Sequence, residues 1–186
     1  MLAGYIDVVG VNYYIHNQWR HPNGHGAMIA PSDSCYRHVR WMLAEVYERY
    51  RCPIFIAETG IEDEARPAWL RYIANEAAAA ISMGVPVEGV CLYPILNHPG
   101  WEDARHCHNG LFDYADEHGH REVYLPLAEE LACQTRRMEA IRAGCEPFTG
   151  QGDDAGFALD WAAHVMAGRS DFGRREQAVH SYSNLI

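Results

Sequence analysis

The 186-residue chain lacks several features from which a function is usually inferred. It contains no lysine, so all fifteen of its basic residues are arginine. Its 25 acidic residues give a formal net charge of −10 at neutral pH. A protein that binds nucleic acid needs a basic face that neutralises phosphates. We therefore expect no nucleic-acid partner.

The chain also lacks the cysteine spacing of a disulfide framework and any long apolar run. Six cysteines are spread through the sequence without a CxxC pair, and Cys52 and Cys91 lie in or beside apolar runs of strand length. This distribution predicts reduced, mostly buried thiols. No apolar run approaches the ~18 residues that span a membrane, and no basic-plus-apolar leader precedes a cleavage site. We expect a cytoplasmic protein without a membrane partner.

The chain does contain three short apolar runs, within Tyr5–Tyr14, Pro53–Thr59 and Val87–Tyr93. Such nearly continuous runs, rich in β-branched residues, are typical of strands buried on both faces of a parallel sheet. Apolar residues recur at helical spacing over Val39–Tyr50 and again over Trp69–Ile81. Strands and helices that alternate at this spacing predict right-handed parallel crossovers and an α/β fold.

Polar segments separate these elements. We expect long loops over 15–32 and over 94 to about 126, and a last helix over 127–142. Asp33 or Ser34 is predicted to cap the first helix, because short oxygen-bearing side chains accept the free N–H groups of a first turn.

The composition of the sequence changes beyond Phe148, where glycine and aspartate become frequent. We therefore divide the chain into a folded domain over 1–148 and a polar extension over 149–186. The extension is expected to be flexible, with one short helix near 157–166.

The central run ends abruptly in Glu58, Thr59 and Gly60. In α/β barrels, reactive groups collect at the carboxyl ends of the strands, because the βα loops open there while the strands hold their ends rigid. Glu58 is therefore a candidate catalytic carboxylate. The same position also suits an acid that only caps the next segment or pairs with an arginine, and the run alone leaves both interpretations open.

Four motifs stand in one order over about residues 5–145. DVVGVNYY (7–14) resembles the DFxGxNYY strand of family 1 glycoside hydrolases, and PIFIAETG (53–60) resembles their PIYITENG strand. GVPVEGVCLYPILNHPGW (84–101) resembles GVxxxGYFxWSLLDNFEW, and GLFDY (110–114) resembles GLxYVDY. The resemblance implies an α/β fold that is the C-terminal part, about strands six to eight, of a TIM (β/α)8 barrel.

The family resemblance implies retaining hydrolysis of β-glycosides. In that reaction a carboxylate attacks the anomeric carbon, while a carboxylic acid ~5–5.5 Å away protonates the leaving oxygen. The match assigns Glu58 as the nucleophile and Tyr14 as the phenol that orients it. Asn12 would line the sugar subsite, and Tyr93 and Trp101 stand where the family has two tryptophans. No cofactor is implied.

Three departures from the family pattern bear on activity. Thr59 replaces the asparagine after the glutamate, and Gly100 falls where the family carries a sugar-binding glutamate; Glu102 or Asp103 is the nearest substitute. The acid/base motif NEP is missing, because the similar stretch 75–77 lies within a helical pattern. We therefore expect a fragment, or half of a split enzyme, that is inactive alone. Its partner would be an N-terminal barrel half or another copy of the chain.

The loop between His98 and His120 offers a competing signal. The stretches 106–108 and 118–120 carry histidines, and Cys107, that could ligate zinc. No established ligand spacing such as HExxH or CxxC accompanies them. Histidines that form hydrogen bonds in a polar loop are the simpler interpretation, so we predict no metal site. Cys107 as a nucleophile lacks an identifiable orienting group.

Two functional hypotheses follow. The first is a retaining β-glycosidase acting on a carbohydrate substrate, present as a C-terminal part that holds the nucleophile but not the acid. The alternative is a non-catalytic carbohydrate-binding remnant, or a subunit that completes another barrel, which Gly100, Thr59 and the missing acid favour. A metal-dependent hydrolase is a distant third.

Overall fold

In the described part of the chain, the sheet has three parallel strands. The computed structural model describes residues 6–20, 28–101 and 104–145. Strands β1 (Val9–Asn12), β2 (Ile54–Thr59) and β3 (Val87–Leu92) lie side by side in chain order, and both pairings are parallel. The predicted α/β fold with parallel strands is thereby confirmed. The predicted extension over 149–186 lies outside the described residues.

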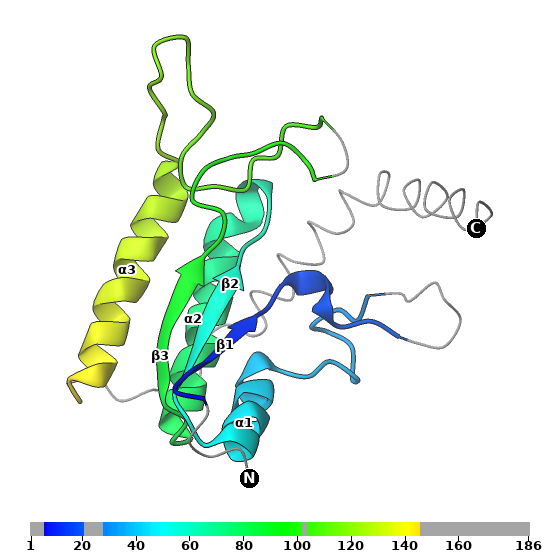
Figure 1. Cartoon of the computed structure of the whole chain (residues 1–186), viewed down its shortest axis with the longest axis vertical. Helices are drawn as coiled ribbons and strands as arrows, with labels where there is room; N and C mark the ends of the chain where they lie inside the picture. Colours follow the sequence, from blue (N-terminus) through cyan, green and yellow to red (C-terminus); the bar gives the residue numbers. More distant parts are fainter. Residues whose placement is uncertain (1–5, 21–27, 102–103, 146–186) are drawn as a thin grey trace.

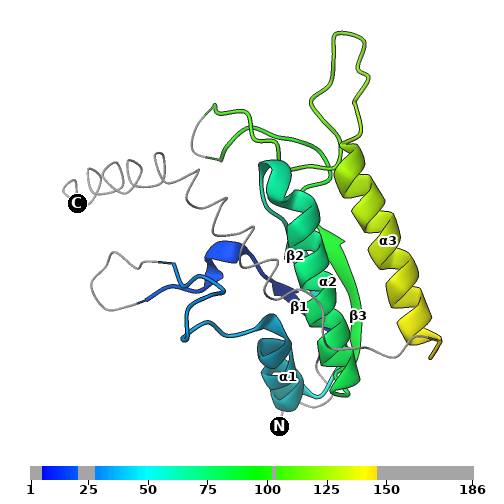
Figure 2. The same ribbon diagram turned by 180° about the vertical axis from the view of Figure 1, so that it is seen from behind.

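The α-helices of the described residues pack on one face of this sheet (Figures 1 and 2). They are α1 (Val39–Tyr50), α2 (Arg66–Ser82) and α3 (Leu125–Arg142). Helix α2 lies behind β2 in Figure 1 and in front of it in Figure 2, with α1 and α3 on either side of it. Two short 3-10 turns, η1 (Ile15–Asn17) and η2 (Asp63–Ala65), follow β1 and precede α2. Because the three strands are parallel, the loop that follows each of them leaves the same end of the sheet, the carboxyl end.

The main core lies between β2 and α2. Ile54 and Ile56 of β2 are fully buried in one cluster with Trp69 and Ile73 of α2. Full burial of one such side chain contributes about 1.5–3 kcal/mol to folding. Leu43 joins the same cluster from α1, so the core ties the central strand to two helices.

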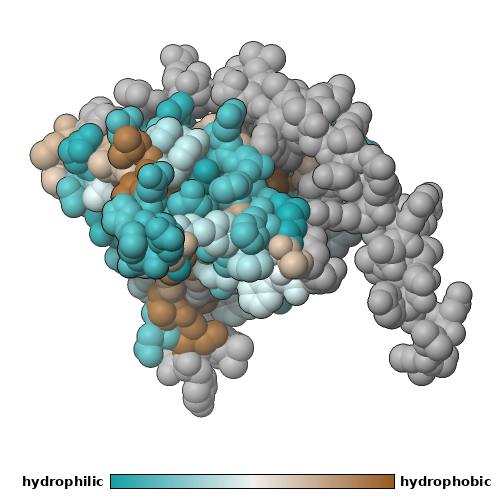
Figure 3. Space-filling view, turned by 90° about the horizontal axis from the view of Figure 1, so that it is seen from above, coloured by the Kyte–Doolittle hydropathy of each residue, from teal (hydrophilic) through white to brown (hydrophobic). Residues whose placement is uncertain are grey.

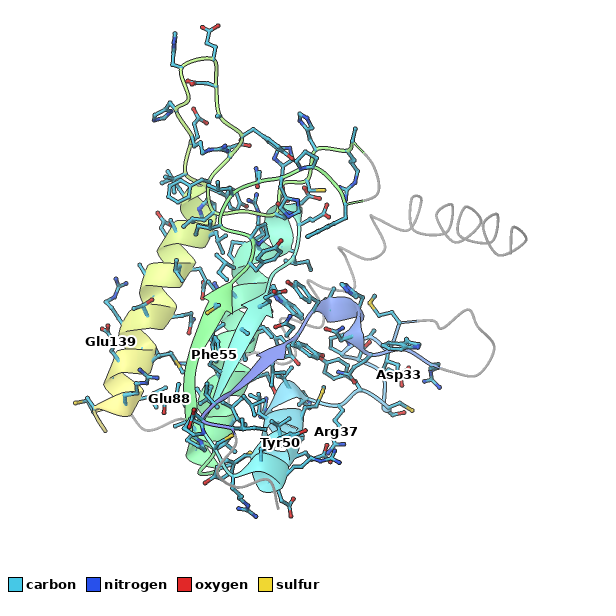
Figure 4. All side chains as sticks on the ribbon, viewed as in Figure 1. Asp33, Arg37, Tyr50, Phe55, Glu88 and Glu139 are labelled. Atoms are coloured by element: carbon cyan, nitrogen blue, oxygen red, sulfur yellow. The ribbon has the colours of Figure 1, made fainter. Side chains whose placement is uncertain are left out.

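The opposite face of the sheet is only partly covered in the described part of the chain. Phe55 (labelled in Figure 4) and Ala57 of β2 are half-buried, whereas Val8 and Cys91 are exposed. The expectation of strands buried on both faces is therefore wrong for these residues. In a closed barrel the inward side chains are covered by strands from across the barrel, and three strands do not close one.

The cysteines also divide into buried and exposed residues. All six are free thiols in this structure, and only Cys52 and Cys107 are buried. The expectation of mostly buried thiols is wrong because four of them, Cys91 among them, lie on surfaces that the described residues leave open. Among the described helices, none has the length and apolar character needed to cross a membrane.

Helix α1 begins without the cap that its sequence predicts. It starts at Val39 after His38, whose side chain forms no capping hydrogen bond. The carboxylate of Asp33 instead accepts hydrogen bonds from the Cys35 N–H and from Arg20. Glu76 of α2 accepts the Arg40 N–H of the first turn at 2.8 Å. A residue from the neighbouring helix thus replaces the local cap.

Glu76 is fully buried between α1 and α2. Its carboxylate also accepts from the Arg40 guanidinium, with Nε at 3.0 Å from Oε2, and lies 3.5 Å from Nδ1 of His38. This ion pair joins the two helices on the covered side of the sheet. The stretch 75–77 therefore lies in the helix layer, as its helical pattern predicts, and not at a strand end.

The buried pair between Glu76 and Arg40 makes a testable prediction about stability. Removing one member of a buried ion pair typically costs about 3–5 kcal/mol, because the other charge stays in a desolvated site. We expect Glu76→Ala to lower the free energy of unfolding by that amount in urea titrations. The matched control is Glu45→Ala, which removes the exposed partner of Arg37 and should change stability by less than about 1 kcal/mol. Equal losses in the two variants would contradict the prediction.

Candidate active site

The carboxyl ends of the three strands meet at one end of the sheet. Beyond the regular ladder, the Tyr13 N–H donates to the Glu58 carbonyl at 3.0 Å. The Tyr93 N–H donates to the Thr59 carbonyl at 2.9 Å. These bonds hold the segment after each strand against its neighbour. Figure 3 looks onto this end of the molecule, where the surface is mainly hydrophilic with separate hydrophobic patches.

A β-bulge in β2 determines which way Glu58 points. In the pairing with β1, Ile56 lies opposite Val11 and Glu58 lies opposite Asn12, so β2 holds one extra residue at this point. Strict alternation would place Glu58 on the same face as the buried Ile56. The extra residue shifts the alternation, and Thr59 turns into the helix layer while Glu58 stays half-buried on the other side.

Glu58 and Tyr14 form a direct hydrogen bond. The Tyr14 phenol donates to Oε2 of Glu58 at 3.0 Å. Burial, and then this hydrogen bond, raise the pKa of Tyr14 above its ordinary value. The phenol therefore stays protonated and remains a donor to the carboxylate. Asn12 lies opposite Glu58 in the ladder with its side chain exposed, so three predicted site residues lie together.

Aromatic rings continue the site along the loop after β3. Tyr93 is half-buried, and its ring lies 6.2 Å from that of His98. The His98 ring in turn contacts Trp101 edge-on at 6.2 Å, and Trp101 is 86% exposed. His98, one of the loop histidines, thus links the ring of Trp101 to that of Tyr93. Glu102 lies outside the described residues.

Close backbone contacts lock the loops around this group. A Cβ atom on Gly60 would lie 1.9 Å from the Tyr93 carbonyl oxygen, so only glycine fits there. Arg105 forms a two-pronged ion pair with Glu62, at 2.6 and 2.9 Å. The Asp63 N–H donates to the His108 carbonyl at 2.8 Å. The loop after β2 is therefore fixed to the loop after β3.

The loop histidines contact aromatic and polar neighbours. His106 stacks on Tyr114 with ring centres 4.5 Å apart, and Nδ1 of His108 lies 3.9 Å from Asp113. The Tyr114 N–H, and then the Asn97 amide, lower the pKa of Asp113. Within the described residues, no three His, Cys, Asp or Glu side chains lie close enough together to hold a metal ion.

A pocket of about 300 Å³ lies beside the loop junction rather than at Glu58. The Arg66 guanidinium lies 3.7 Å from the centre of the Tyr124 ring and donates to the carbonyls of Asp63 and Gly110. Burial lowers the pKa of Arg66. The pocket is lined by Asp63, Glu64, Arg66, His108 and Tyr124. It shares no lining residue with the group around Glu58. We therefore assign Arg66 a structural role, in which its hydrogen bonds join the loop after β2 to the loop after β3.

Parallel strands with helices on one face, and polar groups at their carboxyl ends, define the class of fold as part of a (β/α)8 barrel. A scan against protein-family models finds no match, and a search of curated proteins finds none. Solved structures of β-glucosidases and of a β-glycosidase do match, and the likeness is one of fold.

Three of these structures illustrate the match. The family 1 β-glucosidase of Thermotoga maritima, in complex with isofagomine lactam, gives a TM-score of 0.53 at 21% identity over 68% of this chain and 34% of its own. The β-glycosidase of Thermosphaera aggregans gives 0.51 at 20% identity over 72% and 33%. A hyperthermophilic β-glucosidase mutant gives 0.54 at 19% identity over 69% and 34%. At these identities the likeness shows the fold alone, and the chain spans about a third of each structure.

The contact between Gly60 and Tyr93 makes a prediction about the rim of the site. Gly60→Ala would place a methyl group on a backbone carbonyl, so the strand ends must separate. We expect a loss of about 1–3 kcal/mol in the free energy of unfolding, as for other overpacked sites. The control is Gly89→Ala, where an added Cβ meets no atom within 4 Å and stability should stay within about 0.5 kcal/mol. Equal stability of the two variants would show that the close approach is not real.

The hydrogen bond between Tyr14 and Glu58 makes a prediction about titration. Exposed tyrosines ionise near pH ~10, whereas Tyr14 should stay protonated to higher pH. Glu58→Gln removes the charged acceptor, so the Tyr14 pKa should fall toward its ordinary value but stay above it, since burial is the larger cause. The measurement is a ¹³C NMR titration of ζ-labelled tyrosine, with Tyr14→Phe to assign the signal. An unchanged Tyr14 titration in Glu58→Gln would rule out the bond.

Proposed function

We propose that this chain is the nucleophile-bearing part of a retaining β-glycosidase, with a carbohydrate as substrate. The observation that carries the proposal is the Tyr14–Glu58 hydrogen bond at the carboxyl end of β2. A nucleophilic carboxylate must be ionised at the moment of attack, and a protonated phenol stabilises the ionised form. Tyr14 donates to Oε2 of Glu58, and we assign Oε1 of Glu58 to the attack on the anomeric carbon.

The neighbouring residues supply sugar contacts in this proposal. The exposed Asn12 amide offers hydrogen bonds to sugar hydroxyls from a position opposite Glu58. The faces of Tyr93 and Trp101 suit the apolar C–H surface of a pyranose ring, and His98 joins the two rings. Glu102 remains the proposed substitute for the carboxylate that Gly100 lacks.

The reaction needs a second carboxyl group. When Glu58 forms its bond to the anomeric carbon, the bond to the leaving oxygen breaks, and that oxygen takes a proton from a general acid. Water then cleaves the glycosyl–enzyme bond while the same group, now a base, accepts its proton. We propose that a polypeptide carrying the remaining strands supplies this group, because the chain spans about 34% of the barrels that it matches.

A non-catalytic role in carbohydrate binding is the second candidate. Its strongest support is Gly100, which offers no carboxylate to the sugar hydroxyls, and the wide exposure of Trp101. Thr59 no longer supports this candidate. Its side chain is fully buried in the helix layer, so its replacement of asparagine leaves the open face of the site unchanged.

An activated 2-deoxy-2-fluoro-β-glucoside tests the nucleophile without the missing acid, because its leaving group departs unprotonated. We expect the intact mass to rise by one sugar on the wild-type chain, with the adduct on Glu58, and to stay unchanged in Glu58→Gln. The matched control is Glu88→Gln, at the opposite end of the sheet, which should keep the adduct (Figure 4). Native mass spectrometry of the same sample gives the number of chains in the reactive species.

The contrary result is also informative. A folded chain that binds the reagent but forms no adduct, alone or mixed with an N-terminal barrel piece, would favour the binding role. An adduct on any carboxylate other than Glu58 would overturn the assignment of the nucleophile.

A further inference from the structure

Trp69 of α2 is packed against residues that adjoin both members of the Tyr14–Glu58 pair. Its indole Nε1–H donates to the Thr59 hydroxyl at 2.8 Å. Trp69 is 1% exposed and Thr59 is 0% exposed, so this hydrogen bond forms away from water. Thr59 directly follows Glu58 on β2. The bond therefore fixes the residue next to the proposed nucleophile from the covered side of the sheet.

The same indole also fixes the residue before Tyr14. The rings of Trp69 and Tyr13 are stacked, with centres 6.0 Å apart and planes 7° from parallel. Tyr13 is 4% exposed, and its backbone N–H donates to the Glu58 carbonyl at 3.0 Å. One buried side chain thus contacts a neighbour of each residue in the pair.

A closed group of rings holds Tyr13 and Trp69 in place. The Tyr13 hydroxyl is 3.3 Å from that of Tyr36 and accepts from Gln18 at 2.8 Å. The Tyr36 hydroxyl is 2.5 Å from that of Tyr72, whose ring packs back on Trp69 at 5.6 Å. Burial raises the pKa of both Tyr13 and Tyr36, so these phenols stay neutral and hydrogen-bonded.

We infer that Trp69 is a positioning residue, which sets the orientation of Glu58 and Tyr14 through Thr59 and Tyr13. Successive side chains of a strand point to opposite faces, so a small turn of the backbone at Thr59 moves the Glu58 carboxylate. Reaction rates are sensitive to such shifts, since displacement by about 1 Å can cost on the order of 100-fold. The inference rests on the proposed role of Glu58 and adds a residue that touches no substrate.

A purely structural role for Trp69 makes a different prediction. Trp69→Phe keeps an apolar ring in the core but removes the N–H donor, and Thr59→Val keeps the shape of the side chain but removes the acceptor. Thr59→Ser restores a hydroxyl. If only packing mattered, Trp69→Phe would lower stability and leave the Tyr14–Glu58 hydrogen bond intact. If the indole hydrogen bond positions the pair, Trp69→Phe and Thr59→Val each weaken the Tyr14–Glu58 hydrogen bond. The double variant then weakens that bond no further than either single variant does.

The test is the ¹³C NMR titration of Tyr14 in the full chain, with urea unfolding measured on each variant. Glu58, Tyr93 and the stacked His16 are titratable groups that interact with Tyr14, and all the variants retain them. We expect Trp69→Phe and Thr59→Val to shift the Tyr14 titration to lower pH by similar amounts. Thr59→Ser and the exposed control Trp41→Phe should keep the wild-type titration.

A wild-type Tyr14 titration in Thr59→Val, which leaves the indole ring untouched, would overturn the inference even if Trp69→Phe does not fold. The titration needs no sugar, so its result is separate from the identity of the nucleophile. Where the fluoroglucoside adduct forms, both variants should slow labelling on the order of tenfold without weakening reversible binding of the reagent. If labelling slowed only because the variants bound the fluoroglucoside more weakly, that result would also contradict the inference about Trp69.

Discussion

The packing of α2 against the central strand is the constraint on which the rest of this structure depends. Ile54 and Ile56 bury one face of β2 against that helix, and Trp69 extends the contact to the carboxyl end of the strand. Helix α1 joins through the buried pair of Arg40 and Glu76, and α3 joins through Glu130, which Arg71 of α2 contacts at 2.5 Å. The polar groups at the strand ends are therefore held by contacts made on the far side of the sheet.

Much of the architecture could be predicted from the sequence because its signals are local. The three apolar runs each form a strand, and α2, which ends at Ser82, is followed by Gly84 with φ of 83°, the left-handed conformation that favours glycine. The last helix begins at Leu125, two residues earlier than predicted, because Pro126 is tolerated in a first turn. The predicted likeness to part of a β-glucosidase barrel is confirmed at the level of fold.

The features that the sequence does not predict depend on contacts between distant residues. The cap of α1 comes from Glu76, 36 residues beyond the N–H group that it accepts. The direction of Glu58 depends on a bulge that appears only when β2 pairs with β1, and simple alternation would have placed its carboxylate in the core. Trp69 fits the apolar face of its helix, and nothing in that pattern indicates a hydrogen bond to Thr59. Local patterns thus indicate the candidate site residues, whereas tertiary contacts determine how their side chains are oriented.

The half-covered sheet has a thermodynamic consequence. The heat capacity and denaturant dependence of unfolding both scale with the apolar area that becomes exposed. A sheet that buries only its helix side among the described residues has less area to expose than a closed domain of similar length. A polypeptide that covered Phe55, Ala57 and Cys91 would bind the folded state and not the unfolded one. The melting temperature of this chain would then rise with the concentration of that polypeptide, so folding and assembly would be one equilibrium.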